Sequence, residues 1–299
     1  MWSSNAIMMR KWLSVIFIVG VFFISLPMQA EAALQDGFYQ KNGELLSVKD
    51  VARRFSTYDV IFFGEYHDNT WIHEQENEFL KALYKEKPNL ILSLEMFERD
   101  VQPYLDKYLR NQISEKDFLE NSRPWKNYSE DYKPCIEFAK NKQIAVLGGN
   151  IPRYLAAEYA KSGTLYSIEE VKKKYLPSKH IVNHDVYYAA FVSYMKSGQV
   201  GMRLDDAQIE RYYQAQCLKD DAMAESIVEA LKQNKGKTIL HLQGEFHGRN
   251  RLGVVEKVRL LNPNLRTGLI TSVYVSSEAE KNLAIQNLAD GDIALIVQK

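Results

Sequence analysis

Two apolar segments far apart in this 299-residue chain end in almost the same pattern. Residues 59–63 (DVIFF) lead into GEYH at 64–67, and residues 238–242 (TILHL) lead, after one glutamine, into GEFH at 244–247. Continuous apolar runs of this length are typical of strands covered on both faces, as in a parallel sheet. The sequence therefore predicts two buried strands, each followed by a glycine, a carboxylate and a histidine.

Further apolar segments alternate with helical patterns along the chain. Strands are also expected at 89–94, 143–147, 266–275 and 292–297, and helices at 47–55, 71–85, 132–140, from about 154, at 205–233 and at 254–261. A helical region is expected at 101–120, with Ser114 as a plausible cap. Such alternation predicts a parallel sheet with right-handed crossovers. We expect an α/β fold with a mainly parallel sheet flanked by helices, formed by residues 33–162 and 203–299. Residues 163–202 break the alternation and are expected to form a smaller inserted helical cap.

The first 32 residues have the pattern of a signal peptide. Arg10 and Lys11 precede an apolar run at 12–26, and a small-residue stretch follows at 30–33. This run is shorter than the roughly 20 apolar residues of a membrane-spanning helix. We therefore expect an exported, periplasmic protein, with an uncleaved N-terminal anchor as the alternative. No cysteine lies near the cleavage site, so a lipoprotein anchor is not indicated.

Composition narrows the function classes only slightly. Lysine plus arginine and aspartate plus glutamate are equal at 38 each, which gives no indication of a nucleic-acid partner. Tyrosine is abundant, with 18 residues. The two cysteines, Cys135 and Cys217, either form a disulfide in an exported protein or remain buried thiols. No C-x-x-C motif is present, so a cysteine zinc site and a dithiol redox motif are not supported.

Polar side chains follow four of the expected strands. These are Glu65 and His67; Glu95; Asn150 and Arg153; and Glu245 and His247. In a parallel sheet the carboxyl ends of the strands lie at one edge, where ligands bind, so these side chains are expected to converge. Histidine and carboxylate are ligands for zinc, manganese or iron. One hypothesis places a metal on His67, Glu95 and His247, with Glu65 or Glu245 as general base; a metal-free cluster of hydrogen-bonded residues is the alternative.

The remaining histidines give weaker signals. His73, within an expected helix, is predicted to be solvated or to cap the helix. His241 lies inside a strand and is predicted to be a core residue bonded to a neighbour. His180 and His184 have the spacing of one helix face, which is a weak metal signal because a helix at that position is itself uncertain.

Six motifs carry a family resemblance. They are FGEYHDN (63–69), LEMFERDVQ (94–102), RPWKNY (123–128), NIPR (150–153), AQCLKDDAMA (215–224) and GEFH (244–247). In this order they resemble the ChaN-like haem-binding proteins of the Tiki/TraB/erythromycin-esterase-like superfamily. The resemblance extends over most of the chain that follows the expected signal peptide.

The resemblance implies haem binding linked to iron acquisition, through a tyrosine ligand at a homodimer interface and basic side chains that hold the propionates. Tyrosine is a known axial ligand of haem iron. The first choice of ligand is Tyr154, beside Arg153 and Asn150, and the next choices are Tyr187 and Tyr188, near His184. An outer-membrane haem or iron uptake protein is an expected partner.

The hydrolase branches of the same superfamily imply a different activity. They suggest a metal-dependent peptidase or esterase, with zinc or manganese, that uses both G-x-x-H motifs and a carboxylate. Here the corresponding residues are Glu65, His67, Glu95 and His247, with Glu245 as a second possible base. The sequence thus leaves two function classes open, a haem-binding protein and a hydrolase.

Overall fold

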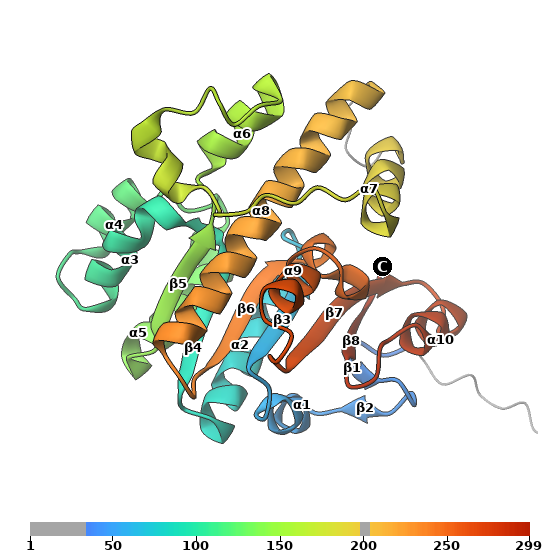
Figure 1. Cartoon of the computed structure of the whole chain (residues 1–299). Helices are drawn as coiled ribbons and strands as arrows, with labels where there is room; N and C mark the ends of the chain where they lie inside the picture. Colours follow the sequence, from blue (N-terminus) through green and yellow to red (C-terminus); the bar gives the residue numbers. More distant parts are fainter. Residues whose placement is uncertain (1–33, 198–203) are drawn as a thin grey trace, which may run out of the picture. The chain divides into compact units, whose positions relative to one another are not determined.

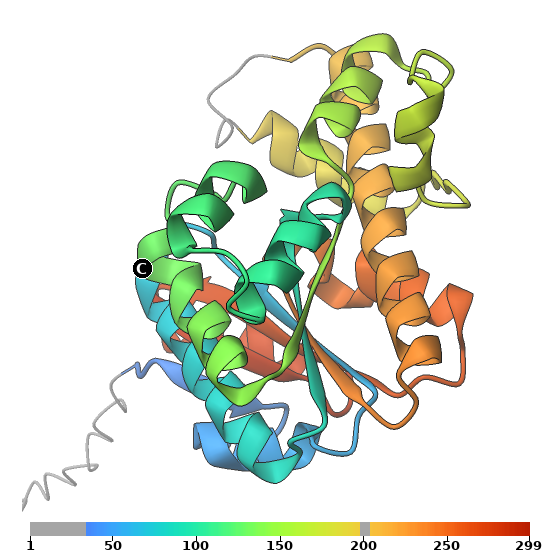
Figure 2. The same cartoon turned by 90° about the vertical axis from the view of Figure 1, so that its left-hand side faces the viewer.

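The computed structural model describes residues 34–197 and 204–299 (Figures 1 and 2). The predicted signal peptide, residues 1–32, and residues 198–202 of the predicted cap lie outside this described part of the chain. Within the two ranges, no helix combines the length and apolarity that a membrane span requires.

The sheet is mainly parallel, as predicted. The described residues form one eight-stranded sheet in the order β2-β1-β8-β7-β3-β6-β4-β5. Its strands are β1 (Gly37–Gln40), β2 (Leu45–Leu46), β3 (Val60–Glu65), β4 (Leu90–Glu98), β5 (Ala145–Asn150), β6 (Thr238–Gly244), β7 (Thr267–Val275) and β8 (Ile293–Gln298). Strands β3 to β8 pair in parallel, whereas the β1–β2 hairpin joins β8 in antiparallel orientation. The α/β fold class is therefore confirmed.

The helices largely follow the predicted ranges. They are α1 (Val48–Phe55), α2 (Thr70–Glu86), α3 (Gln102–Leu109), α4 (Glu115–Ser122), α5 (Lys133–Lys142), α6 (Arg153–Ser162), α7 (Val186–Lys196), α8 (Asp206–Gln233), α9 (Val254–Leu261) and α10 (Glu278–Gln286). The helical region predicted at 101–120, with Ser114 as a plausible cap, consists of α3 and α4, and Ser114 and Asp117 form a capping box that begins α4. Helix α10 was not predicted.

Strand β3 shows why the sheet needs helices on both faces. Ile61 and Phe63 pack in the cluster that includes residues of α1 and α2, whereas Val60 and Phe62 pack in the cluster that includes residues of α8 and α9. All four side chains are completely buried. Alternate residues of a strand point to opposite faces, so an unbroken apolar run is stable only when both faces are covered.

Helix α8 connects the sheet to the surrounding helices. With 28 residues it is roughly 42 Å long. Towards its C-terminus, Met223 and Ile227 pack on the sheet, whereas in its N-terminal half Ile209 contacts the α7 region and Leu218 contacts α6. Figure 1 shows α6 and α7 beside this N-terminal half. The middle of α8 is thereby placed over the carboxyl ends of the strands. The boundaries predicted for the cap, residues 163–202, remain a prediction.

Candidate functional site

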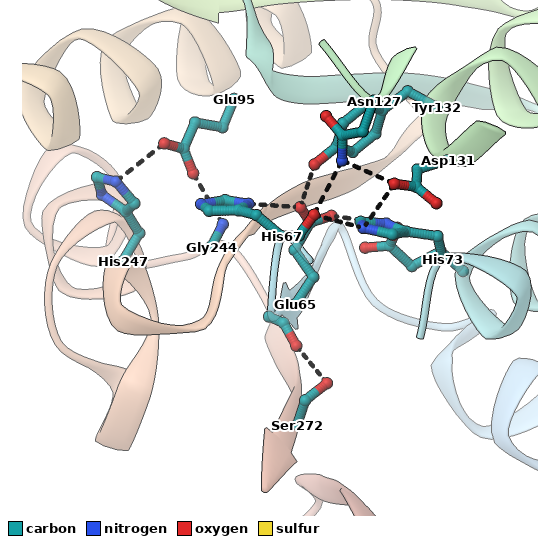
Figure 3. Close-up of polar contacts among 12 residues, drawn as sticks. Glu65, His67, His73, Glu95, Asn127, Asp131, Tyr132, Gly244, His247 and Ser272 are labelled. Atoms are coloured by element: carbon teal, nitrogen blue, oxygen red, sulfur yellow. Dashed lines mark hydrogen bonds and ion pairs between the residues drawn. The ribbon is translucent and has the colours of Figure 1, made fainter. Parts of the chain in front are cut away.

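One pocket of about 480 Å³ lies at the carboxyl ends of β3, β4 and β6. It is lined by Glu65, Tyr66, His67, Asp68, Glu95, Trp125, Phe191, Tyr194, Gln216, Lys219, Gly244, Glu245, Phe246, His247 and Arg249. Both β3 and β4 pair in parallel with β6, so their ends lie side by side. The structure therefore brings together the five carboxylates and histidines that were predicted from the ends of these three strands (Figure 3).

Glu65 and His67 form a pair at the end of β3. Glu65 is 1% exposed, and its Oε1 accepts hydrogen bonds from the Tyr132 hydroxyl and from His67 Nδ1, each at 2.7 Å. Burial alone would raise the pKa of Glu65, but the hydrogen bond and charge of His67 outweigh it and lower the pKa. Burial would conversely lower the pKa of His67, and Glu65 and Glu95 raise it. His67 is thus held by its Nδ1 proton beside the pocket.

His247 lies between two buried carboxylates. Its Nδ1 is 2.5 Å from Asp220 Oδ1, and its Nε2 is 3.1 Å from Glu95 Oε1. Burial alone would lower the pKa of His247, but Glu95 and Asp220 raise it to about 10. The charge of His247 in turn holds the pKa of Glu95 well below its usual range, against the effect of burial. We infer an imidazolium that bridges two carboxylates at neutral pH.

Gly244 allows the two pairs to approach each other. Its backbone N–H donates a hydrogen bond to Glu95 Oε2 at 2.8 Å. A Cβ at this position would lie 2.7 Å from His67 Nε2, closer than real Cβ contacts, so any larger residue would displace the histidine ring. On its other side the ring meets Trp125 edge-on, with centroids 4.7 Å apart. The glycine of the second G-x-x-H motif is therefore required by packing.

The rest of the pocket combines aromatic walls with two cations. Lys219 and Arg249 line it together with Phe246 and Tyr194. Arg249 is held by Glu245, whose two carboxylate oxygens each accept from Nε at 2.8 Å. Glu245, a predicted alternative base, is thus engaged with an arginine. The pocket thus joins aromatic side chains to many ionisable groups, an arrangement suited to a small polar ligand with an apolar part.

The predicted haem contacts at the end of β5 lie outside this lining. Asn150 Nδ2 donates to the carbonyl oxygen of Glu95 at 3.0 Å, and Arg153 Nε donates to Glu98 Oε1 at 2.7 Å. Tyr154, at the start of α6, is 39% exposed, and its hydroxyl is 3.5 Å from Asp100 Oδ2. Arg153 and Tyr154 therefore belong to an exposed surface, whereas Asn150 orders the backbone of β4.

Tyr187 and His184 occupy a different region, near α7. The Tyr187 hydroxyl donates to Asp220 Oδ2 at 2.9 Å, and its ring stacks on Phe246. His184 is exposed and lies 3.0 Å from the carboxylate of Glu210. Helices α6 and α7 lie on either side of α8 in Figure 1, so the structure does not gather Tyr154, Tyr187 and His184 into one site.

The predicted metal ligands His67, Glu95 and His247 share the pocket but not a common ligand centre. Among the described residues, the group of three or more metal-binding side chains whose ligand atoms all lie within 4.8 Å consists of Glu65, His73 and Glu76. Both ring nitrogens of His247 contact carboxylates. A metal on the predicted set would require these side chains to move, so the observed arrangement fits proton transfer and charge stabilisation better.

Comparisons with known proteins identify the family. The family described as "Haem-binding uptake, Tiki superfamily, ChaN" matches residues 51–258. The chain belongs to this family. A solved structure described as cofacial heme binding to ChaN of Campylobacter jejuni is 16% identical, with a TM-score of 0.59, and the match covers 86% of this chain and 94% of that chain.

A second solved structure shows a weaker similarity. The type III effector HopBA1 is 10% identical, with a TM-score of 0.47, over 91% of this chain and 100% of that chain, too weak a likeness to support an argument. Among curated proteins, none matches the chain significantly. The match to the ChaN family supports a haem-related function, and the Campylobacter structure supports the fold.

Three residues at or beside the pocket of this ChaN family member were not predicted from the strand ends: Lys219 and Trp125 line the pocket, and Asp220 contacts His247. Asp220 and Lys219 come from the middle of α8, and Trp125 comes from the loop after α4. Two features of the sequence could have indicated them. Asp220 is an acidic residue within a largely buried helical pattern, and Trp125 belongs to the aromatic loop at 123–128. Spacing could not show that a helix passes above the ends of three strands.

The structure also tests the predictions for the other histidines and the two cysteines. The prediction for His73 is wrong, because its ring is 2% exposed and lies 3.0 Å from Glu76. His241 is the predicted core residue, bonded to Ser93 Oγ at 2.8 Å. His180 and His184 are not helical and contact different carboxylates. Both cysteines are free and buried.

Proposed function

We propose that this protein is an exported haem-binding protein that takes part in haem or iron acquisition. The match of the ChaN family to residues 51–258 carries the proposal. The solved relative from Campylobacter jejuni is described as binding heme cofacially. By analogy, two copies of this chain would each present a tyrosine to a haem iron and enclose the haems between them.

The exposed surface around Tyr154 is the proposed haem contact. Its phenol is accessible and has only a long contact with Asp100, so it can reach an iron atom without breaking a strong internal hydrogen bond. Arg123 and Arg153 are 41% and 52% exposed in their side chains, and Lys172 lies 5.7 Å above the Tyr154 ring. Cationic side chains of this kind suit the two propionates.

Tyr187 is a less suitable ligand on physical grounds. It is 4% exposed, and its hydroxyl is committed to Asp220. Burial, followed by the charge of Asp220, raises the pKa of Tyr187 well above its usual value. Burial and Asp100 also raise the pKa of Tyr154, but Tyr187 has the stronger shift, which opposes formation of the tyrosinate that binds ferric haem. Iron ligation by Tyr187 would also disturb the Asp220–His247 contact.

A ferric haem titration tests this proposal. The mature wild-type chain is expected to give a saturable Soret shift, which Tyr154→Phe abolishes or moves to a different wavelength. Tyr166→Phe is the matched control, because Tyr166 is 94% exposed and lies nearby in the sequence. Size-exclusion chromatography with light scattering should show a dimer only in the haem-loaded protein. A wild-type protein without a saturable shift would overturn the haem proposal, and normal binding by Tyr154→Phe would overturn the choice of ligand.

Export is tested separately. N-terminal sequencing of the protein recovered from a periplasmic fraction should show a new N-terminus near Ala33. A mature chain that starts at Met1 would contradict the proposed signal peptide. Copurification with an outer-membrane uptake protein in the haem-loaded state would support the expected partner.

A hydrolase is the second candidate, favoured by the two histidine–carboxylate pairs that face one pocket. His67 is half-exposed and its Nδ1 is held by Glu65, which leaves its Nε2 to exchange a proton with a ligand, whereas His247 holds Glu95 and Asp220 in position. A panel of chromogenic esters and peptides should reveal turnover that falls in both His67→Gln and His247→Gln and persists in Tyr154→Phe. Equal turnover in all three variants would remove this candidate.

A further inference from the structure

A second polar cluster lies deeper in the protein, on the side of Glu65 away from His247. It consists of Glu65, His73, Glu76 and Asp131, which are 1%, 2%, 1% and 5% exposed. His73 and Glu76 are three residues apart on α2 and so lie on the same face of that helix. Figure 3 shows His73 and Asp131 on one side of Glu65, and Glu95 and His247 on the other.

The carboxylates of this cluster have free oxygen atoms. Glu65 Oε2, Glu76 Oε1 and Asp131 Oδ1 are buried and have no hydrogen-bond partner. Within residues 34–197 and 204–299, the ion pairs of these three side chains involve histidines and neither lysine nor arginine. Each carboxylate has a hydrogen bond to its other oxygen, but a buried carboxylate is costly unless its charge is also compensated. The three carboxylates share one histidine within the cluster, His73, and Glu65 has His67 as a further partner, so the positive charge at the cluster is smaller than the number of its carboxylates.

The geometry fits a metal ion. One ligand atom from each of Glu65, His73 and Glu76 lies within 4.8 Å of the others. His73 Nδ1 is 3.0 Å from Glu76 Oε2 and 3.5 Å from Glu65 Oε2. Ligands about 2.1 Å from a shared ion lie roughly 3.0 to 3.4 Å apart in octahedral or tetrahedral geometry. Only small side-chain adjustments would be needed to close the site.

The surrounding contacts orient these side chains as outer partners of metal ligands do. His73 Nε2, the nitrogen away from the carboxylates, is 3.3 Å from the carbonyl oxygen of His67. Tyr132 donates to Glu65 Oε1 and leaves Oε2 free. A ligating histidine commonly donates its other N–H to a carbonyl or carboxylate, which fixes its tautomer.

We propose that Glu65, His73 and Glu76 bind a divalent first-row transition metal, zinc or manganese, in a buried site that shares Glu65 with the pocket and lies on its far side from His247. One imidazole and two carboxylates suit either ion. The metal would neutralise the cluster and fix the carboxylate of Glu65, whose other oxygen holds His67. It would thus stiffen the floor of the pocket without contacting a ligand there. This site does not depend on haem binding.

Metal content after refolding tests the proposal. Because the site is buried, the mature protein is unfolded in urea with chelator, refolded with zinc, with manganese or with neither, and desalted. Elemental analysis should find about one ion per wild-type chain and a loss of that ion in His73→Gln and Glu76→Gln. Wild-type protein without metal, or variants that retain a full equivalent, would overturn the proposal.

Two controls locate the site. His247→Gln alters the pocket and should leave the metal content unchanged. His180→Gln is the matched control, because His180 also pairs with a carboxylate, Asp221, at 2.8 Å. Loss of the ion in His247→Gln with retention in His73→Gln would instead place the metal in the pocket. The haem titration is run on the same variants, so failure of the haem proposal and failure of the metal site are distinguishable.

A spectroscopic measurement covers the case in which a variant folds poorly. Cobalt(II) in the wild-type site should give visible d–d absorption that zinc displaces. Tyr132→Phe keeps all three ligands but removes a hydrogen bond to Glu65, so it should weaken metal affinity by about 10- to 100-fold. In Glu76→Gln the increase in thermal midpoint produced by zinc should vanish. A cobalt-loaded protein without visible d–d bands beyond those of free cobalt(II) would contradict the assigned ligands. A metal affinity of Tyr132→Phe equal to that of the wild type would contradict them as well.

Discussion

The contact of His247 with two buried carboxylates predicts a large, pH-dependent stabilisation in the metal-free and haem-free protein. Replacement by glutamine removes the cation that Glu95 and Asp220 share, and these carboxylates are 3% and 0% exposed. Removing one partner of a buried ion pair typically costs about 3–5 kcal/mol. The pKa of His247, raised from 6.5 to about 10, corresponds to roughly 5 kcal/mol. These two figures describe the same interaction and are not added.

The pH dependence has a defined sign. The folded-state pKa of His247 lies above the unfolded value, so its contribution to the free energy of unfolding is fully present below pH 6.5. This contribution decreases as the pH rises and is lost at about pH 10. The slope is roughly 1.4 kcal/mol per pH unit. The pKa of Glu95 is lowered, so its contribution is present above its ordinary value of 4.5 and is lost as the pH falls. The pair should therefore be most stabilising between these two ordinary pKa values.

Nuclear magnetic resonance and urea unfolding measure both parts of this prediction. In isotope-labelled protein, the imidazole signal that disappears in His247→Gln should stay in its protonated form from pH 6 to pH 9, a range set by the pKa of about 10. At pH 6, His247→Gln should lower the free energy of unfolding by about 3–5 kcal/mol, whereas His184→Gln, at an exposed pair, should change it by less than about 0.5 kcal/mol. The reasoning is refuted if His247 titrates near 6.5, or if its replacement costs less than about 1 kcal/mol, as at an exposed salt bridge.

Three further predictions follow from packing and burial. Gly244→Ala places a methyl group 2.7 Å from His67 Nε2, so it should displace the ring and lower the free energy of unfolding by about 1–3 kcal/mol. Urea unfolding measures this loss, and the magnetic resonance signal of the His67 imidazole reports the displacement. A His67 signal at the wild-type position would contradict the prediction. Burial raises the pKa of the Cys135 thiol well above its usual value and that of Cys217 to about 12. A thiol reagent at pH 8 should therefore modify neither cysteine until urea is added, and rapid labelling of the native protein would show exposure. Phe63→Ala, at a completely buried position, should cost about 3–5 kcal/mol by calorimetry, and a cost near zero would argue against the observed packing of β3.

The sequence predicted the sheet because its strands carry a strong local signal. The run before Glu65 is apolar at every position, and such a run is stable only between two covered faces. Helix α10 lacked such a signal: its N-terminus is capped by Ser277, but of its residues only Ile285 is buried. The start of α4 did have a local signal, because Ser114, a plausible cap in the sequence, forms its capping box with Asp117.

The sequence also predicted which strand ends converge, because the carboxyl ends of parallel strands necessarily share one edge of the sheet. It could not predict what lies across from them. Asp220 reaches His247 from α8, and Trp125 reaches His67 from a loop. These contacts depend on where a helix crosses the sheet, which local spacing does not encode.

His73 illustrates the limit most clearly. A histidine on a helix among glutamates is usually solvated, and its own neighbours gave no reason to expect otherwise. Only the packing of α2 against β3 and residues 128–132 buries His73 beside Glu65 and Tyr132. Thus the sequence by itself determined the parallel sheet and the convergence of its strand ends, because both follow from hydrophobic periodicity. The tertiary structure alone decided which carboxylates share a histidine, because that depends on burial and on distances of a few ångströms between segments far apart in the chain.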